Sequence, residues 1–165
     1  MKYILVVFFV IYSYGIELKY KSFSADFNQS VKSDNKIILY EGNLKVKNNL
    51  IFWHYKKPIE KKIWITNKIF IYEPDLEQVT IYNKDNNLFK LLKNAKKIKK
   101  DLYVNKYENR NIYFVIKNKM ITKIYYKDKI DNLVTLNFYN IKNEKLDNSI
   151  FRVKYPDYVD IINSQ

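Results

Sequence analysis

Apolar and polar residues alternate along most of the chain, which is the pattern of β-strands that bury one face. Turn-forming Asn, Asp and Lys residues separate the alternating segments. The pattern predicts about ten short strands, over residues 22–31, 37–47, 50–56, 62–66, 69–73, 78–82, 103–107, 111–117, 121–126, 133–139 and 150–153. A sheet with this many strands curls, so the pattern favours a mainly β protein with a strongly curved antiparallel sheet or partial barrel.

Two local signals refine this sheet. Gly42 lies inside a predicted strand, where a glycine usually marks a bulge or a sharp bend. Asn48-Asn49 is a turn signal between two strands, so segments 37–47 and 50–56 are expected to form a hairpin.

One segment changes its period. Within residues 87–100, apolar side chains recur at helical spacing and lysines occupy the opposite positions. The apolar positions are Leu88, Leu91, Leu92, Ala95 and Ile98. We expect an amphipathic helix lying across the sheet. One helix of this length cannot fill a barrel, so part of the interior is expected to be open or filled by a ligand.

The first residues have the order of a secretory signal. Lys2 gives a positive start, residues 3–12 are apolar but too short to span a membrane, and Ser13-Tyr14-Gly15 offers small residues at a cleavage site. We expect residues 1–15 to be a signal peptide cleaved after Gly15, leaving residues 16–165 as one domain. The alternative is a buried N-terminal strand or helix.

Composition narrows the function. The chain has no cysteine, so it has neither a disulfide nor a cysteine for a lipid anchor, and we expect a soluble exported protein. Its formal net charge of +13 becomes +12 without Lys2. The basic residues are nearly all Lys, and Lys, Asn, Ile and Tyr are in excess together, which indicates a coding bias. We therefore interpret the basic runs as solvated faces and expect no nucleic-acid partner.

The residues for catalysis are sparse. His54 is the single histidine, which together with the absence of cysteine argues against a metal site. Carboxylates crowd the turn around Pro74, at Glu73, Asp75 and Glu77, but such groups are usually solvated. Only two glycines are present, so there is no glycine-rich phosphate loop. The sequence predicts a protein that is not an enzyme and needs no cofactor.

Several motifs together resemble LolA, the family of periplasmic carriers of outer-membrane lipoproteins. They are Ser22-Phe23-x-Ala25-x-Phe27-x-Gln29, Glu41-Gly42-x-Leu44, Trp53-His54-Tyr55 with Pro58, Tyr72-x-Pro74-x-Leu76-Glu77-Gln78-Val79, Leu88-Phe89-x-Leu91-Leu92, and at the end Phe138, Asn140, Phe151, Pro156, Val159 and Asp160. The resemblance spans most of the chain after residue 15. It implies an incomplete, half-open antiparallel barrel with one or more short helices as a lid over an apolar cavity for lipoprotein acyl chains.

The resemblance also implies partners and a location. The cargo is lipidated lipoprotein, accepted from an inner-membrane ABC-type releasing complex and passed to an outer-membrane receptor by a monomer in the periplasm. The family normally has an Arg shortly before the Trp strand that helps to hold the lid. Lys47 stands there in this chain, and a lysine cannot make a bidentate guanidinium contact.

From these patterns we assign candidate residues. The cavity wall is predicted to contain Phe27, Leu44, Ile51, Trp53, Ile63 and Ile65, the lid Leu88, Leu91 and Leu92, and the lid contact Lys47. The opposite faces of the same strands are the alternative, because alternation does not say which face is inside. The alternative functions are a periplasmic sensor or regulatory domain that binds a lipid or protein signal, the receptor of the same pathway, which needs a lipidated cysteine, and a polyanion-binding protein.

Overall fold

The computed structural model describes residues 19–83 and 94–164. Within these residues the chain forms twelve strands and two short 3-10 helices. The elements are β1 (Ser22–Lys32), β2 (Ile37–Lys47), β3 (Leu50–Lys57), β4 (Lys61–Ile65), β5 (Lys68–Glu73), η1 (Pro74–Leu76), β6 (Gln78–Asn83), β7 (Lys96–Lys99), β8 (Leu102–Tyr107), β9 (Arg110–Lys117), β10 (Met120–Lys127), β11 (Leu133–Asn143), η2 (Asn148–Phe151) and β12 (Asp160–Ser164).

The strands hydrogen-bond in the order β12-β6-β5-β4-β3-β2-β1-β11-β10-β9-β8-β7. The order has two ends, so the sheet of the described residues is not closed. The prediction of a mainly β chain is therefore confirmed. The chain divides into two compact units, and β1 and β11 contribute residues to both of them.

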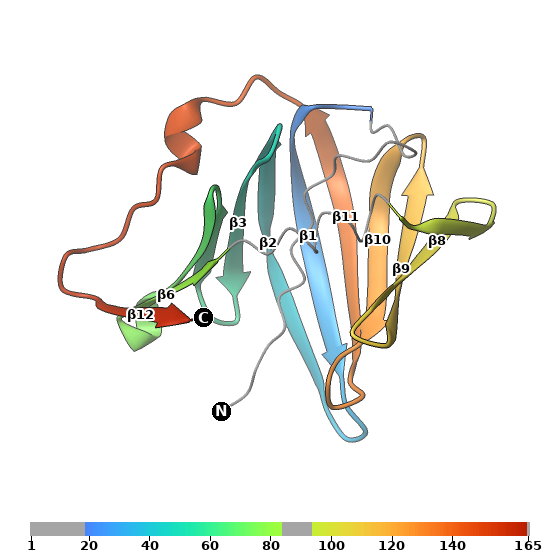
Figure 1. Cartoon of the computed structure of the whole chain (residues 1–165), viewed down its shortest axis with the longest axis horizontal. Coiled ribbons are helices and arrows are strands. Elements are labelled where there is room, and N and C mark those ends of the chain that lie inside the picture. Colours follow the sequence, from blue (N-terminus) through green and yellow to red (C-terminus); the bar gives the residue numbers. More distant parts are fainter. Residues whose placement is uncertain (1–18, 84–93, 165) are drawn as a thin grey trace. The chain divides into compact units, whose positions relative to one another are not determined.

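Unit 2 comprises Tyr20–Gln29, Leu39–Asp85 and Asn137–Gln165. Strands β2 to β6 are antiparallel neighbours joined in sequence. The predicted hairpin is confirmed, because Lys47 pairs with Leu50 and Asn48 adopts a positive φ of 52°. The last segment of the chain runs through η2 and returns as β12, which pairs in parallel with β6 (Figure 1).

Two segments that are far apart in the sequence meet within this unit. The Ser22 hydroxyl donates to the carbonyl of Glu144 at 2.6 Å, and the Glu144 amide donates back to the carbonyl of Ser22 at 3.3 Å. Asn140 Nδ2 also donates to Asp26 Oδ2 at 2.9 Å. The first and the eleventh strand are therefore joined by backbone and side-chain bonds.

Among the described residues, unit 1 comprises Lys19, Ser30–Ile38 and residues 94–136. Its centre is the antiparallel group β8-β9-β10, which buries Ile112, Phe114, Ile124 and Tyr126 on one face. Burial among these side chains raises the pKa of the Tyr126 hydroxyl. Tyr113 and Tyr125 pair across the other face with parallel rings 4.8 Å apart.

The described part of the predicted helix is not helical. Lys96–Lys99 forms β7, which pairs with β8, and Ile98 is exposed. Within the described part, the helical spacing depends on Ala95 and Ile98 alone, and all four residues of β7 are exposed, as an edge strand permits. The lid residues Leu88, Leu91 and Leu92 lie outside the described residues.

Two further elements differ from the prediction. Segment 150–153 was expected to be a strand, but Asn148–Phe151 is η2, whose first turn is capped by the Asp147 side chain accepting from the Ser149 amide. Strand β12 was not predicted, because its pairing with β6 depends on contacts distant in sequence. With β7, it brings the strand count to twelve, where about ten were expected.

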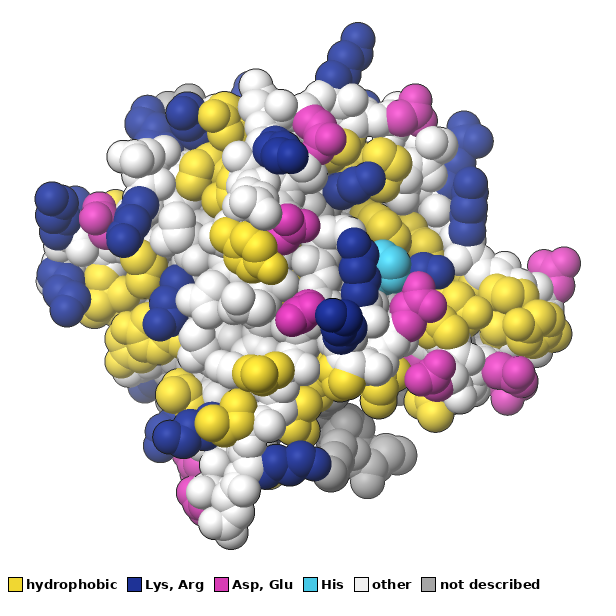
Figure 2. Space-filling view, turned by 180° about the vertical axis from the view of Figure 1, so that it is seen from behind, with side chains coloured by type: hydrophobic (Ala, Val, Ile, Leu, Met, Phe, Trp, Pro, Cys, Tyr) yellow, Lys and Arg dark blue, Asp and Glu magenta, His cyan; other side chains and the backbone are white. Residues whose placement is uncertain are grey.

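The basic runs at residues 56–57 and 96–100 are solvated, as the sequence predicts, whereas the run at residues 61–62 is partly buried and ion-paired. Lys56, Lys57 and the lysines of β7 are exposed, and Lys61 and Lys62 form ion pairs with Glu73 and Glu60. In the surface view, basic side chains stand among acidic and hydrophobic ones (Figure 2). The lysines of these runs are thus either in water or beside a carboxylate.

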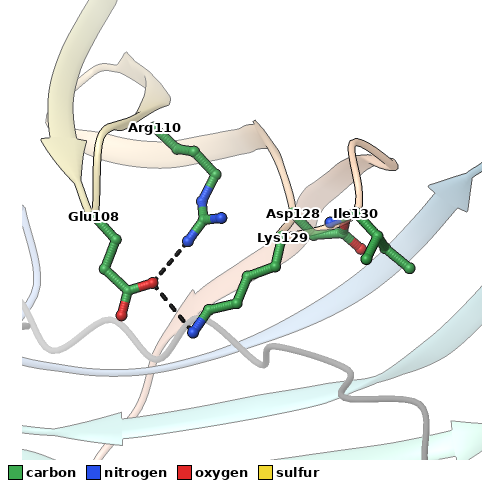
Figure 3. A network of polar contacts seen from close by, with 5 residues as sticks. All are labelled: Glu108, Arg110, Asp128, Lys129 and Ile130. Atoms are coloured by element: carbon green, nitrogen blue, oxygen red, sulfur yellow. Dashed lines mark hydrogen bonds and ion pairs between the residues drawn. The ribbon is translucent and has the colours of Figure 1, made fainter.

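Two turns of unit 1 meet through one carboxylate. Glu108, in the turn after β8, accepts from Arg110 at 2.7 Å and from Lys129 at 3.3 Å (Figure 3). Asp128 accepts from the Ile130 amide at 2.9 Å and so closes the second turn. Glu108 and Asn109 both have positive φ, the conformation of a tight two-residue hairpin turn. These exposed ion pairs position the turns and add little stability.

Gly42 provides the first test of the fold. The register of β2 and β3 shifts between Glu41 and Gly42, which confirms the predicted irregularity. A methyl group at this position would overlap the backbone oxygen of His54 and lie 2.7 Å from ring carbons of Phe27. Because a backbone oxygen cannot simply turn away, we expect Gly42→Ala to lower the free energy of unfolding by about 3 kcal/mol.

Urea denaturation measures this loss. The matched control is Asn43→Ala on the same strand, whose half-exposed side chain is expected to change the stability by less than about 0.5 kcal/mol. Equal midpoints for Gly42→Ala and the native chain would show that β2 and β3 are not this close.

Candidate functional site

The six predicted wall residues lie on one buried face of unit 2. Leu44 of β2 pairs with Trp53 of β3, which pairs with Ile63 of β4. Ile51 of β3 pairs with Ile65 of β4, and Phe27 comes from β1. None of the six side chains is more than 7% exposed. The structure therefore brings together all six residues that the alternation selected, and we call this set the Trp53 face.

Aromatic rings occupy the middle of the Trp53 face. The ring of Phe27 contacts Trp53 and Tyr55 edge-on, with centroids 5.1 and 4.9 Å apart. Phe138 of β11 contacts Trp53 edge-on at 5.9 Å. Phe27 reaches this position because Gly42 has no side chain in the space that its ring occupies. Edge-on pairs are the favoured arrangement of aromatic rings, so this cluster gives the face a defined shape.

Two polar features interrupt this apolar face. The Tyr55 hydroxyl donates to Oε1 of the buried Gln29 at 2.8 Å, so each satisfies the other. The indole Nε1 of Trp53 is buried and has no hydrogen-bond acceptor among the residues that the structure describes. A buried donor without a partner costs about 1–3 kcal/mol. Sequence reasoning did not single out this nitrogen, because its lack of a partner depends on the three-dimensional position of every acceptor around it.

The opposite face of β4, together with its neighbours β5 and β6, is also apolar, but the C-terminal segment covers it. Trp64, Tyr72 and Val79 form a buried cluster there, against which Val153, Tyr155 and Val159 of the C-terminal segment pack. The indole nitrogen of Trp64 donates to the carbonyl of Ile150 at 3.3 Å. At Trp64 the alternative face thus lies under the protein's own C-terminal segment. Sequence reasoning missed this cover because it assigned residues 150–153 to a strand.

Lys47 fixes that C-terminal segment. Its ammonium group donates to the carbonyl of Leu146 and to Oδ1 of Asn148, both at 2.7 Å. Hydrogen bonds from Ser149, with the nearby Lys47 charge, lower the pKa of the adjacent Asp147 carboxyl. Lys47 was predicted to contact the lid. Because the lid residues lie outside the described part of the chain, that contact stays a prediction, whereas the contact with the C-terminal segment is observed.

His54 lies in a small charged cluster on the face opposite Trp53. Its Nε2 is 2.8 Å from Oε1 of Glu60, and Lys62 Nζ is 3.1 Å from the same oxygen. In Figure 2 the imidazole is the cyan side chain, with basic and acidic neighbours. The bonds from His54 and then from Lys62 lower the pKa of the Glu60 carboxyl. His54 is a partly exposed residue of β3. The described residues contain no group of three or more His, Cys, Asp or Glu side chains able to hold a metal ion.

Comparison with known proteins first identifies the fold. A LolA superfamily protein from Nitrosomonas europaea superposes with a TM-score of 0.56, covering 84% of this chain and 93% of that structure at 14% sequence identity. At this identity the likeness concerns the fold alone. Among the residues that the structure describes, no helix is long and apolar enough to cross a membrane.

Sequence comparison then gives the family. The family model "Outer membrane lipoprotein carrier protein LolA" matches residues 18–125. The outer-membrane lipoprotein carrier protein of Campylobacter jejuni is 36% identical over 98% of this chain and 99% of its own length. The protein of the same name from Wolinella succinogenes is 32% identical, with 86% of both chains covered. The chain belongs to the LolA family, which confirms the resemblance seen in the sequence.

The Lys47 contacts can be tested by removing the charge while keeping the length. Lys47→Met loses two hydrogen bonds to the C-terminal segment, and we expect a loss of about 1–2 kcal/mol in the free energy of unfolding. Amide hydrogen exchange should accelerate in residues 144–151. Lys45→Met removes the same charge from the same face of β2 and is the matched control. Equal exchange in the two variants would contradict the tether.

The Glu60 cluster predicts a pH dependence. Because the pKa of Glu60 is lower in the folded chain than its ordinary value of 4.5, its contribution to stability is present above that pH and is lost as the pH falls through the folded value. We expect Glu60→Gln to be less stable than the native chain at pH 7, with the difference shrinking towards pH 3. Glu60 is 41% exposed, so the effect is small. Urea midpoints measure it, and Glu77→Gln, an exposed carboxylate, should show no such trend.

Proposed function

We propose that this chain is a periplasmic chaperone that binds the acyl chains of lipoproteins released from the inner membrane and carries them to an outer-membrane receptor. The observation that carries the proposal is the Trp53 face, where all six residues predicted to hold acyl chains form one continuous buried apolar surface. Membership of a family described as outer membrane lipoprotein carriers supports the same function. No feature of the structure favours the sensor alternative.

The physical requirement is to hide hydrocarbon reversibly. Each methylene of an acyl chain gains about 0.8 kcal/mol on leaving water, so the carrier needs a large apolar surface. In the described structure the side chains of the Trp53 face contact one another, as the edge-on contacts of Phe27 and Trp53 illustrate. Acyl chains therefore have to part these side chains, and the contacts that close again after release limit how tightly the cargo is held. This balance suits a carrier that has to unload.

The remaining parts of the proposal follow the family. Residues 1–15 direct export and are removed, and residues 16–165 act as a monomer in the periplasm. Leu88, Leu91 and Leu92 form the inner side of a lid over a half-open barrel. An inner-membrane ABC-type complex loads the carrier, and an outer-membrane receptor accepts the cargo. The proposal involves no covalent step, no cofactor and no nucleic acid.

A solubility assay tests the proposal. The chain without residues 1–15 is mixed with a lipidated lipoprotein in detergent, the detergent is removed, and the soluble fraction is separated by size. We expect the lipidated cargo to stay soluble and to migrate with the carrier, because its acyl chains are buried on the Trp53 face. The unlipidated form of the same lipoprotein is the control and should migrate alone. Equal behaviour of the two forms would refute the carrier function.

A further inference from the structure

The two tryptophans of the chain differ in one respect. Trp64 Nε1 donates to the carbonyl of Ile150, whereas Trp53 Nε1, on a side chain only 1% exposed, has no acceptor within residues 19–83 and 94–164. Buried donors in folded proteins are rarely left without a partner, and the exceptions often mark a place where another molecule binds. The exception here lies at the centre of the face proposed to bind cargo.

The described residues around Trp53 supply no acceptor to its indole nitrogen. Its ring contacts are Phe27, Tyr55 and Phe138, and its cross-strand neighbours are Leu44 and Ile63. The buried polar pair on this face is Gln29 with Tyr55, and the Gln29 oxygen accepts from the Tyr55 hydroxyl and not from the Trp53 indole. The Trp53 face therefore offers a hydrogen-bond donor within an apolar surface and lacks the matching acceptor.

The chemistry of the missing acceptor can be narrowed. The residues of the Trp53 face and its aromatic cluster include no Lys or Arg, so a buried carboxylate or phosphate would lack a counter-charge and would be costly. A bare hydrocarbon chain has no acceptor at all. An uncharged carbonyl oxygen attached to an apolar chain accepts a hydrogen bond and needs no counter-charge. Ester and amide carbonyls that join acyl chains to a larger molecule have this chemistry.

We propose that Trp53 Nε1 donates a hydrogen bond to the uncharged ester or amide carbonyl at the head of a bound acyl chain, which makes Trp53 a specificity-determining residue for acylated cargo. This inference rests on the proposed carrier function for the identity of the occupant. Apolar burial alone cannot distinguish an acyl chain from an alkyl chain of the same length. A donor that is satisfied only by a carbonyl distinguishes the two chains. The analogue without the carbonyl leaves this donor buried and unpaired.

A pair of uncharged lipids isolates the carbonyl. Dioctanoylglycerol carries two ester carbonyls, and di-O-octylglycerol is the corresponding ether without them. The affinity of each lipid is measured by displacement of a fluorescent fatty-acid probe from the chain without residues 1–15. The ratio of ester to ether affinity is then compared between variants, so that the different water solubility of the two lipids cancels. We expect Trp53→Phe to lower this ratio roughly tenfold.

Trp64→Phe is the matched control. It makes the same side-chain change on the opposite face, where the indole nitrogen is already bonded to Ile150, and it should leave the ratio unchanged. An unchanged ratio in Trp53→Phe would overturn the inference. Failure of the native chain to bind either lipid would instead remove the carrier function on which the inference rests.

A spectroscopic measurement covers the case in which Trp53→Phe does not fold. The native chain has two indole N–H resonances, and Trp64→Phe assigns them. On binding dioctanoylglycerol, the Trp53 proton should move downfield, because it gains a hydrogen bond to a carbonyl, while the ether should leave it near its starting position. Equal movement with both lipids, or no movement while the ester is bound, would overturn the inference.

Discussion

Unit 2 depends on the contact between the Phe27 ring and the backbone of Gly42. The ring lies where any other residue at position 42 would place its side chain, and the backbone oxygen of His54 closes the same space. From this position Phe27 reaches both Trp53 and Tyr55. One absent side chain thereby lets three strands share an aromatic cluster, and that cluster determines which residues become buried on the Trp53 face.

The same strands bury a second apolar face, and the two faces are covered differently. On the second face the C-terminal segment packs on Trp64, Tyr72 and Val79, with its backbone held by Trp64 and Lys47. Polar bonds of defined geometry make that cover a permanent part of the fold. The described contacts of the Trp53 face are ring contacts and aliphatic packing, apart from the bond between Tyr55 and Gln29. Packing of this kind is non-directional, so it adapts to a flexible acyl chain more readily than a hydrogen-bonded cover.

Alternation in the sequence could predict most strands and the buried face, because a period of two places Ile51, Trp53 and Tyr55 together whatever the surrounding fold. It could not predict β7, whose four residues are all exposed and therefore carry no alternation. Nor could it identify η2, since Ile150 and Phe151 are residue types common in strands and only the cap at Asp147 and the contact with Trp64 decide otherwise. The unpaired nitrogen of Trp53 could not be predicted either. The sequence shows that Trp53 carries a hydrogen-bond donor, but only the folded chain decides whether an acceptor reaches it.

The bonds between Ser22 and Glu144 have a consequence for the order of folding. They join residues 122 positions apart, and β1 lies between β2 and β11 in the sheet. The edge of β1 that pairs with β11 therefore stays unpaired until β11 has been synthesised. Closing so long a loop is slow compared with pairing neighbouring strands. The sheet is therefore completed only when nearly the whole described chain, from β1 to β11 and beyond, is available for pairing.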